Sequence, residues 1–487
     1  MAPITTEEFM KALSCAGNGA PGTNGVDAAM LRHAPADKLE QLRLGMNGVL
    51  SGSLVVPSEW RKAQIILLPK DGSPANPTNY HPISLLQVLY KIFMKIITTH
   101  LSAVTSQHIL NHAQMGFRKG MSAQSALWAL TDILEDSKAR SSELHVAYID
   151  FRKAFDYMCH DVLFETLEFY GLSVLFIGLI KKLYTDCSSD LYLNNSTSEL
   201  FPISHGVHQG DTLSPLLFIL AINLALEWID RPGAGYQFQN GMHIPVVGYC
   251  DDIALLSNSA TDLEGAFEKL VEFGAWAGLE INPGKSAYSC SHANVTAALK
   301  VIVMKRGAPM VEVVPILPPG SSYHYMGVLV NLHLNWDSHL AHVQKKVTAY
   351  QHMIHHQALT TDDKVYVSNM VANAFVSYSM CVVPYPRVWL MEVQDIILTT
   401  IKSSMGVPRN ADEEPFFMPI LEGGRGLVNL LDLQVAVTCS STLQELTSLA
   451  LSASTSTATW HLAYSIKDSH IERWVNALRQ QGWQAWP

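Results

Sequence analysis

The stretch GYCDDIALL, residues 248–256, places two adjacent carboxylates, Asp251 and Asp252, between the apolar runs IPVV and IALL. Two short runs of β-branched and aliphatic residues around a tight break predict a β-hairpin. The usual break is Asn-Gly or Asp-Gly, because those residues accept a positive φ. Neighbouring carboxylates repel each other, and burying either one without a partner is costly, so this pair indicates a site for cations. Hard divalent ions with oxygen ligands, Mg²⁺ above all, fit that description. The alternative is a solvated acidic turn, which the apolar flanks disfavour.

Composition favours a folded chain of two or three lobes. The chain has 487 residues, 48% of them hydrophobic, and a formal net charge of -10. This length exceeds one ordinary core, and the acidic balance argues against a wholly basic nucleic-acid-binding surface. Residues 57–125 are locally basic, with two anions against seven cations: Arg61, Lys62, Lys70, Lys91, Lys95, Arg118 and Lys119. One lobe could therefore hold an anionic ligand.

The seven cysteines are scattered and form no CxxC pair, which indicates reduced thiols in an intracellular protein. The N-terminus lacks the basic and then apolar order of a signal peptide. The longest apolar stretch, residues 213–229, contains Pro215, Asn223 and Glu227. We therefore predict a buried helix there and no membrane partner.

Strands and helices alternate around the hairpin. Residues 5–13, 28–50, 85–104 and 213–229 have helical patterns, whereas AQIILLP (63–69) and HVAYID (145–150) predict strands. The sequence therefore predicts an α+β fold with helices packed on an antiparallel sheet. After residue 323 the pattern becomes mostly helical, through 342–359 and 388–405. Residues 451–459 read as a linker before a last helix over 471–481.

A two-metal site needs a further carboxylate from another strand. Asp150 ends the apolar strand HVAYID, where its side chain can project toward the hairpin tip. Taken alone, an aspartate at a strand end is more often a helix N-cap or a turn residue. Together with the hairpin pair it becomes the expected third ligand.

Several ordered segments resemble the reverse transcriptase of non-LTR (LINE-type) retrotransposons. In chain order they are PGTNG, LLPKDG, NYHPISLL, QMGFRKGMS, AYIDFRKAFD, GVHQGDTLSPLLF, YCDD, GLEINPGKS and YHYMGV, followed by MGVPRN and GGRGL. The resemblance covers roughly residues 5–431. A YxDD tetrapeptide alone would be a weak signal, whereas this ordered series is a strong one.

The resemblance implies a role for each matching residue. Asp150, Asp251 and Asp252 would be the catalytic metal triad, with the Phe151 carbonyl as an extra ligand. The implied cofactors are two Mg²⁺ ions, with Mn²⁺ as an alternative. The implied substrate-binding residues are Phe155 under the deoxyribose, Gln209 and Gly210 at the incoming nucleotide, Lys70 and His81 at the triphosphate, and Lys285 behind the site. A core Phe and solvated surface lysines are the competing explanations.

Three positions depart from the family pattern. His81 stands where the family usually has Arg, His208 where it usually has a basic residue, and Asn24 where it usually has Asp. Replacing Arg by His removes a permanent charge and a bidentate phosphate fork, which lowers the expected nucleotide affinity. We also see no segment that matches an endonuclease, RNase H or a Cys/His knuckle. The expectation is thus a fragment, a decayed copy or a domesticated polymerase.

The resemblance implies a right-hand polymerase fold. The predicted divisions are fingers over residues 1–122, a palm over 123–334, a helical thumb-like region over 335–450, and a linker with a C-terminal helix over 451–487. The implied partners are an RNA template, a DNA or RNA primer, dNTPs and an endonuclease supplied in trans. Nuclear action is implied by the resemblance alone. The histidine cluster HMIHHQ, residues 352–357, is predicted to be surface or thumb packing rather than a metal site.

Three functions remain open. The leading hypothesis is an RNA-directed DNA polymerase that extends a primer by two-metal nucleotidyl transfer. The second is a catalytically silent reverse-transcriptase-like fold that binds RNA or serves as a scaffold. The third is an enzyme of the group II intron maturase type, which GVHQGDTLSPLLFIL fits less well.

Overall fold

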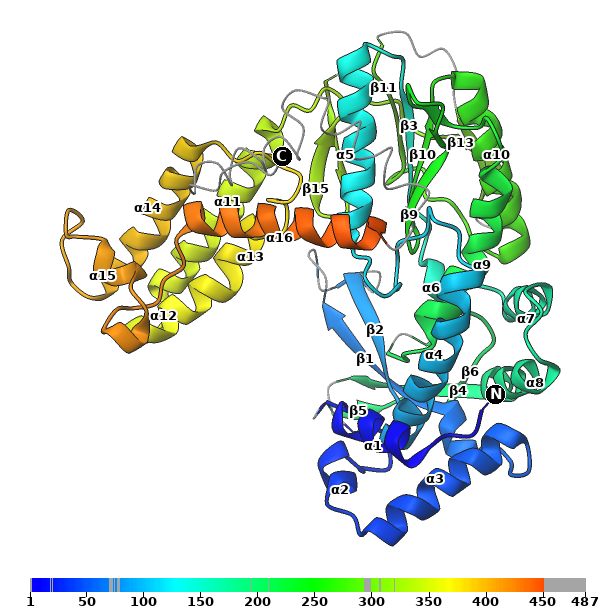
Figure 1. Cartoon of the computed structure of the whole chain (residues 1–487). Coiled ribbons are helices and arrows are strands. Elements are labelled where there is room, and N and C mark those ends of the chain that lie inside the picture. Colours follow the sequence, from blue (N-terminus) through cyan, green and yellow to red (C-terminus); the bar gives the residue numbers. More distant parts are fainter. Residues whose placement is uncertain are drawn as a thin grey trace.

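The computed structural model describes residues 2–450 except 18, 20, 70–72, 74, 77–78, 194, 209, 293–298, 306–307 and 319. The fold is α+β, as the sequence predicts, and helices and strands alternate as far as β15 (Figure 1). The predicted linker at 451–459 and the helix at 471–481 lie outside the described residues. None of the described helices combines the length and the apolar character needed to cross a membrane.

The N-terminal part of the chain, up to residue 108, is mainly helical. Thr5 caps the first helix in a reciprocal capping box with Glu8, in agreement with the sequence prediction. The helical stretch predicted over 28–50 is instead two helices, because the chain turns over residues 33–35 and Pro35 precedes the second one. The helices of this region are α1 (Thr6–Ser14), α2 (Ala28–Arg32), α3 (Ala36–Ser51), the 3₁₀ turn η1 (Ser58–Arg61) and α4 (Val88–His108).

One sheet joins distant parts of the sequence. β1 (Lys62–Pro69) pairs antiparallel with β2 (Tyr80–Leu85) and parallel with β4 (Cys187–Leu193). The two short strands β5 (Ser196–Thr197) and β6 (Phe201–Ile203) then pair with β4. Strands from the predicted palm range 123–334 therefore complete the sheet that begins in the predicted fingers range 1–122.

A second, antiparallel sheet has the strand order β11-β3-β10-β9. Its strands are β3 (His145–Ile149), β9 (Val246–Tyr249), β10 (Asp252–Ser257) and β11 (Ala287–Cys290). All five residues of β3 are buried. Alternate residues of this strand enter two different hydrophobic cores, Ala147 and Ile149 on one side and Val146 and Tyr148 on the other. Burial of both faces explains why β3 reads as an uninterrupted apolar run.

Helices cover both faces of this central sheet (Figure 1). The predicted apolar helix is confirmed as α9 (Ser214–Ile229), which is almost completely buried and packs with α10 (Ala260–Ala277) in the first core. On the opposite face lies α5 (Ala123–Arg140), which contributes to the second core. The remaining elements around the sheet are α6 (Ala154–Tyr157), α7 (His160–Phe169), α8 (Val174–Tyr184), β7 (Tyr236–Gln237), β8 (His243–Ile244), β12 (Lys300–Lys305), β13 (Ala308–Val313), β14 (Ser322–Tyr325) and β15 (Val328–Asn331).

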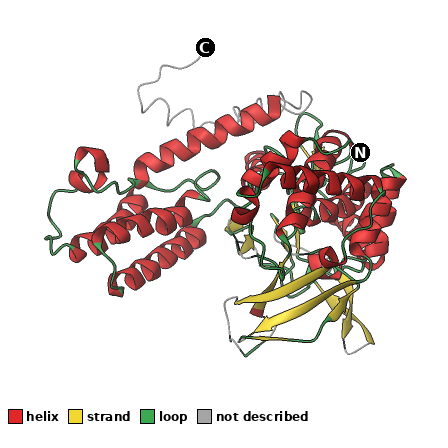
Figure 2. Ribbon diagram, turned by 90° about the horizontal axis from the view of Figure 1, so that it is seen from below, coloured by secondary structure: helices red, strands yellow, loops and turns green. Residues whose placement is uncertain are grey.

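The chain after β15 is helical, as predicted, and its helices lie to one side of the sheets (Figure 2). They are α11 (Asp337–His356), α12 (Thr361–Val367), a π-helical turn (Ser368–Ala372), α13 (Asn373–Ser377), α14 (Arg387–Ser404), α15 (Glu414–Phe417), the 3₁₀ turn η4 (Ile420–Glu422) and α16 (Leu430–Ala450). Their apolar residues, such as Val347 of α11 and Ile397 of α14, continue the second core. His352, His355 and His356 are exposed on α11, in agreement with their predicted surface position.

Candidate active site

The hairpin between β9 and β10 forms as predicted, but its turn differs in detail. Tyr249 pairs with Asp252, so Cys250 and Asp251 are the two turn residues and Asp252 already belongs to β10. Cys250 takes the positive φ, +61°, that Asn or Gly usually supplies. Asp251 is partly exposed, and Asp252 is exposed. The turn therefore presents both carboxylates at the end of a buried strand pair.

A buried glutamine holds this turn in place. The side-chain oxygen of Gln114 accepts hydrogen bonds from the backbone N–H groups of Cys250 and Gly116, both at 2.8 Å. Its amide donates to the Cys250 carbonyl at 3.3 Å. A Cβ on Gly116 would lie 2.6 Å from the Cys250 nitrogen, so only glycine allows this approach. Sequence reasoning used this segment only as a family match and missed Gln114 as a positioning residue.

Asp150 lies at the neighbouring strand end, where its backbone and side chain are held by one turn. Ser286 Oγ accepts from the Asp150 backbone N–H at 3.1 Å. Asn282 donates from its side chain to Asp150 Oδ2 at 3.0 Å, and from its backbone to the Asp150 carbonyl at 2.8 Å. β3 pairs directly with β10, so Asp150 and the hairpin carboxylates lie at the same end of these two central strands.

The three carboxylates affect one another electrostatically. Although part of the Asp252 residue is open to solvent, the protein around its carboxyl group desolvates it. This desolvation, and then the charges of Asp251 and Asp150, raise the pKa of Asp252 to about 6. The pKa of Asp251 is raised by burial and by Asp150, and that of Asp150 is raised by burial. Lys285 opposes this trend, since its charge lowers the pKa of both Asp150 and Asp252. Carboxylates gathered in this way disfavour their charged forms unless a cation joins them.

The chemistry of this donor set fits a hard divalent ion. Carboxylate oxygens are the ligands that Mg²⁺ prefers, and a bound cation would offset the mutual repulsion that raises the pKa values. The oxygens of the three aspartates do not all lie within 4.8 Å of one another. Asp150, Asp251 and Asp252 are thus neighbours at the ends of paired strands, with their carboxylates more widely spaced than the ligands of a single ion.

Two further side chains border the carboxylates. Lys285 is exposed, and its backbone carbonyl accepts a hydrogen bond from the Tyr323 hydroxyl at 2.6 Å. The charges of Asp150 and Asp252 contribute to the raised pKa of Tyr323. Tyr323 stacks on Tyr148 of β3 with ring centroids 4.3 Å apart. The YHYMGV segment therefore provides a support for the site, which its family match alone did not indicate.

The two phenylalanines that follow Asp150 occupy different surroundings. Phe151 is buried, and its backbone forms a bridge with Ile281. Phe155 is only partly buried and stacks on Phe218 of α9 with ring centroids 4.5 Å apart. Its backbone carbonyl accepts from Val207 at 2.7 Å, which connects it to the loop before α9. The structure therefore leaves one side of Phe155 open while the other packs on the core.

Only part of the predicted nucleotide-binding set can be placed. Gly210 has a φ of +122°, and a Cβ there would lie 2.7 Å from the carbonyl oxygen of Ser84 in β2. This close approach brings the 206–211 loop against the strand that carries His81, whose backbone pairs with Leu68. The side chain of His81 and the whole of Lys70 and Gln209 lie outside the described residues.

Three basic residues on this side, His208, Arg118 and Arg61, contribute less to a ligand site than their number suggests. Burial and the neighbouring His160 lower the pKa of His208 to about 4, so its ring is neutral at pH 7. Arg118 donates to the backbone carbonyls of Ser106, Asn111 and Gln114. Arg61 pairs with Asp186 at 3.5 Å. Some of the cations counted between 57 and 125 therefore support the fold rather than face a ligand.

Comparison with known proteins assigns the chain that carries these three carboxylates to a family. The profile of the family described as "Reverse transcriptase (RNA-dependent DNA polymerase)" matches residues 68–330, more than half of the chain. The chain belongs to this family. Its fold is the right-hand polymerase fold, and a requirement for divalent metal is general for the family.

Named relatives come from retrotransposons. The probable RNA-directed DNA polymerase from transposon BS of Drosophila melanogaster is 28% identical over 360 residues, 72% of this chain and 38% of that protein. The retrovirus-related Pol polyprotein from type-1 retrotransposable element R2 of Popillia japonica is 25% identical over 440 residues, 88% of this chain and 58% of that protein. The chain therefore spans less than two thirds of the length of each.

A solved structure with a weaker likeness is a telomerase from Candida tropicalis in complex with a TWJ fragment of telomeric RNA. Its TM-score is 0.43 at 13% identity, and the match covers 91% of this chain and 68% of that one. At this score, the assignment to the family rests on the sequence matches alone.

Proposed function

We propose that this chain is an RNA-directed DNA polymerase from a retrotransposon-type element, which adds dNTPs to a primer 3′-hydroxyl on an RNA template. The observation that carries the proposal is that Asp150, Asp251 and Asp252 lie at the ends of paired strands. Burial raises the pKa of all three, and neighbouring carboxylates add to the shift of Asp251 and Asp252. Family membership supplies the reaction class.

Asp150, Asp251 and Asp252 would hold two Mg²⁺ ions, with the Phe151 carbonyl as an extra ligand and Mn²⁺ as an alternative metal. When bound, the metals would lower the pKa of the primer hydroxyl and stabilise the leaving pyrophosphate. The chain itself positions the reactants. Asn282 and Ser286 fix Asp150, and Gln114 fixes the hairpin turn. Preorganised groups of this kind cost little reorganisation during the reaction.

The nucleotide would enter between the hairpin and the 206–211 loop. Phe155 would lie under its deoxyribose and exclude a 2′-hydroxyl, and Gln209 and Gly210 would contact it. Lys70 and His81 would hold the triphosphate, while Lys285 would steady the leaving phosphate. The electrostatic reach of Lys285 to Asp150 and Asp252 supports its place in this set.

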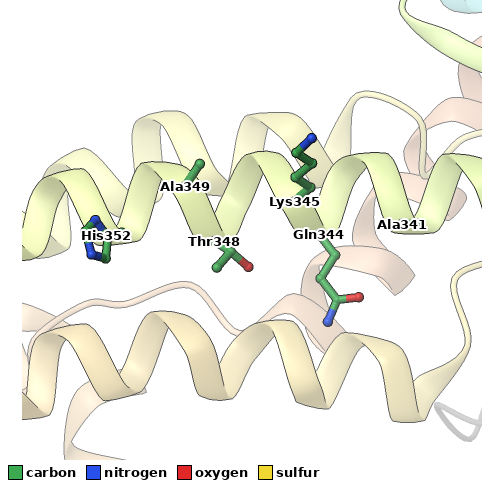
Figure 3. Close-up of a pocket in the computed structure, with 6 residues that line it drawn as sticks. All are labelled: Ala341, Gln344, Lys345, Thr348, Ala349 and His352. Atoms are coloured by element: carbon green, nitrogen blue, oxygen red, sulfur yellow. The ribbon is translucent and has the colours of Figure 1, made fainter.

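The template and primer would lie across the palm, residues 123–334, against the helical thumb-like region 335–450. A groove runs along one side of α11 and is lined by small and polar side chains (Figure 3): Ala341, Gln344, Lys345, Thr348, Ala349 and His352. Such residues suit contacts to a phosphate backbone, which do not read sequence. Binding should weaken as salt rises, and only gently because few cations are available. An endonuclease supplied in trans stays a prediction, as does nuclear action.

The second candidate is a catalytically silent fold that binds RNA or serves as a scaffold. The observations that favour it are the lowered pKa of His208, which leaves its ring neutral, the ion pair of Arg61 with Asp186, and the hydrogen bonds of Arg118 to backbone carbonyls. These features lower the charge available to a triphosphate. They leave the three carboxylates unchanged.

Primer extension on an RNA template with Mg²⁺ and dNTPs separates the two candidates. We expect extension by the wild type, and a loss of at least a thousandfold in the double variant Asp251→Asn/Asp252→Asn. Asp262→Asn, an exposed aspartate in α10, is the matched control and should retain full activity. A folded wild type that does not extend primers, and does not bind dNTPs in a metal-dependent way, would establish the silent candidate.

A further inference from the structure

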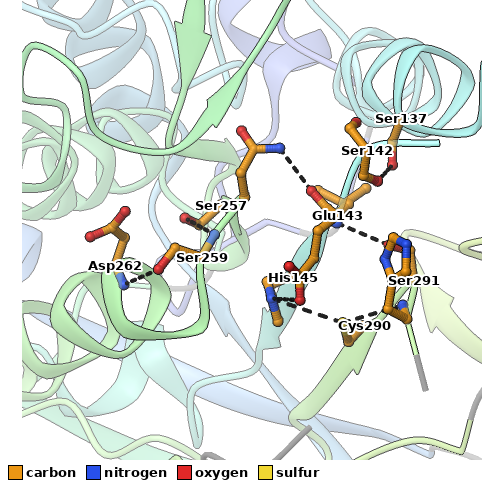
Figure 4. A network of polar contacts seen from close by, with 12 residues as sticks. Ser137, Ser142, Glu143, His145, Ser257, Ser259, Asp262, Cys290 and Ser291 are labelled. Carbon is orange, nitrogen blue, oxygen red and sulfur yellow. Dashed lines mark hydrogen bonds and ion pairs between the residues drawn. The ribbon is translucent and has the colours of Figure 1, made fainter. Parts of the chain in front are cut away.

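A second group of metal-ligand side chains lies at the opposite end of the central sheet. Glu143, His145 and Cys290 each offer a donor atom, and these atoms all lie within 4.8 Å of one another (Figure 4). Within the part of the chain that the structure describes, no other group of three meets this criterion. His145 Nε2 is 3.0 Å from Glu143 Oε1 and 3.9 Å from Cys290 Sγ.

The imidazole of His145 is oriented by its other nitrogen. Nδ1 lies 2.6 Å from the hydroxyl of Tyr288 in β11. When Nδ1–H donates to this oxygen, the lone pair of Nε2 faces Glu143 and Cys290. Histidines that bind metals usually have their second ring nitrogen fixed by such a partner. The Tyr288 hydroxyl would therefore hold the His145 ring in the orientation that metal binding requires.

The backbone around these side chains is also fixed. His145 and Cys290 are directly paired across β3 and β11. Next to them, Leu144 and Ser291 exchange two hydrogen bonds of 2.9 Å. Burial raises the pKa of the Cys290 thiol, and the backbone N–H of His292, 3.4 Å from Sγ, opposes that shift. The three donors thus converge on a rigid part of the sheet.

The separations suit a tetrahedral ion. Zinc binds sulfur at about 2.3 Å and nitrogen or oxygen at about 2.0–2.2 Å, so ligand atoms around it lie roughly 3.3–3.6 Å apart. The two measured separations, 3.0 and 3.9 Å, bracket this range. Thiolate, imidazole and carboxylate together favour zinc over Mg²⁺, which avoids sulfur.

An ion could reach the group from solvent. His145 and Cys290 are only 2% and 4% exposed, whereas the side chain of Glu143 is 52% exposed. A site of this kind has two buried ligands and one at the surface that can admit the ion. A water molecule would fill the fourth position.

We propose that Glu143, His145 and Cys290 form a zinc site that ties the start of β3 to the end of β11. The five residue steps from His145 to Asp150 span about 17 Å along the strand, so this site is separate from the catalytic carboxylates. Its role is structural: it fixes one end of the sheet whose other end carries Asp150.

The test is Zn²⁺ and Co²⁺ binding to the full chain under reducing conditions in excess Mg²⁺. We expect one Zn²⁺ per chain and a thiolate-to-cobalt charge-transfer band. Because the Cys250 thiol contacts Asp251, the band is assigned by its loss in Cys290→Ser and its persistence in Cys250→Ser. Cys290→Ser should abolish the band and lower zinc affinity about 100-fold. Glu143→Gln should lower the affinity about tenfold.

Cys187→Ser, a buried cysteine of β4 outside the group, is the matched control and should retain the band. Glu143→Gln keeps its size at a half-exposed position, so it tests the site even if Cys290→Ser does not fold. A chelator should lower the Tm of the wild type by several degrees and leave that of Glu143→Gln less affected. A folded wild type without the thiolate band, or a band that persists in Cys290→Ser, would overturn the proposal.

Discussion

The carboxylate side and the nucleotide side of the candidate active site differ in how completely they are built. On the carboxylate side, the buried Gln114 fixes the hairpin turn that carries Asp251, and the half-buried Asn282 holds the side chain of Asp150. On the nucleotide side, the 206–211 loop contains the neutral His208 and the buried acid Asp211. The difference teaches that metal chemistry and substrate affinity can be set separately, because their residues come from different elements.

The largest expected effect tests the carboxylate side alone. Asp150→Asn keeps the shape of the side chain and can still accept the hydrogen bond from Asn282, but it removes the charge. We expect primer extension to fall at least a thousandfold with little change in thermal stability, because the lost interaction acts on the metals and the transition state. Asp262→Asn is again the control. Activity within tenfold of the wild type would mean that Asp150 is not a metal ligand.

The next largest effect concerns Asp211, the buried acid on the nucleotide side, and its influence on the free energy of unfolding. Burial raises the pKa of Asp211 to about 6, although it accepts hydrogen bonds from Tyr90, Ser214 and the Leu213 backbone. The folded state therefore holds this proton more tightly than the unfolded chain. Its contribution to stability is fully present below about pH 4 and is lost as the pH rises through 6.

The size of this contribution is up to about 3 kcal/mol, from a shift of about two pKa units. Asp211→Asn should remove it, so the unfolding free energy of the variant should fall less than that of the wild type between pH 4 and pH 7. Urea unfolding at several pH values measures the difference. Parallel curves for the two proteins would show that Asp211 is already ionised at low pH.

Gly210→Ala sharpens the comparison at the contact between the loop and β2. The new Cβ would clash with the Ser84 carbonyl and would also require a strained φ. We expect kcat/KM for dNTPs to fall about tenfold or more, mainly through KM, because the loop must move away from the strand. Gly233→Ala is the control, since Gly233 also has a positive φ but has nothing within 4 Å of its Cβ position. Equal effects of both variants would mean that strain alone is responsible.

The smallest expected effect is a gain. His81→Arg restores the permanent charge and the phosphate fork that the family usually has at this position. We expect the KM for dNTPs to fall several-fold with kcat nearly unchanged, measured by steady-state extension at pH 7.5. His333→Arg, at an exposed position before α11, adds the same charge elsewhere. A similar change in both variants would indicate a general effect of net charge.

Much of the fold could be predicted because its signals are local. The capping box at Thr5 and Glu8, the apolar run of β3 and the paired runs around Asp251 each depend on neighbours within a few residues. The hairpin carboxylates could be singled out for the same reason. Two adjacent like charges between apolar strands repel each other, and bound cations would offset that repulsion. The break between α2 and α3 was missed, although Pro35 lies within the predicted helical stretch and is the local signal for it.

The sequence by itself determined most of the elements and the family to which the chain belongs, and it predicted the three carboxylates as the catalytic set. Only the tertiary structure decided which distant segments meet: β1 with β4, Gln114 with Cys250, and His145 with Glu143 and Cys290. The tertiary structure also places His208 where burial and His160 lower its pKa, which keeps the ring neutral. The physical reason is that helix and strand periods are fixed by local backbone geometry, whereas strand order, burial and the resulting pKa shifts depend on long-range packing.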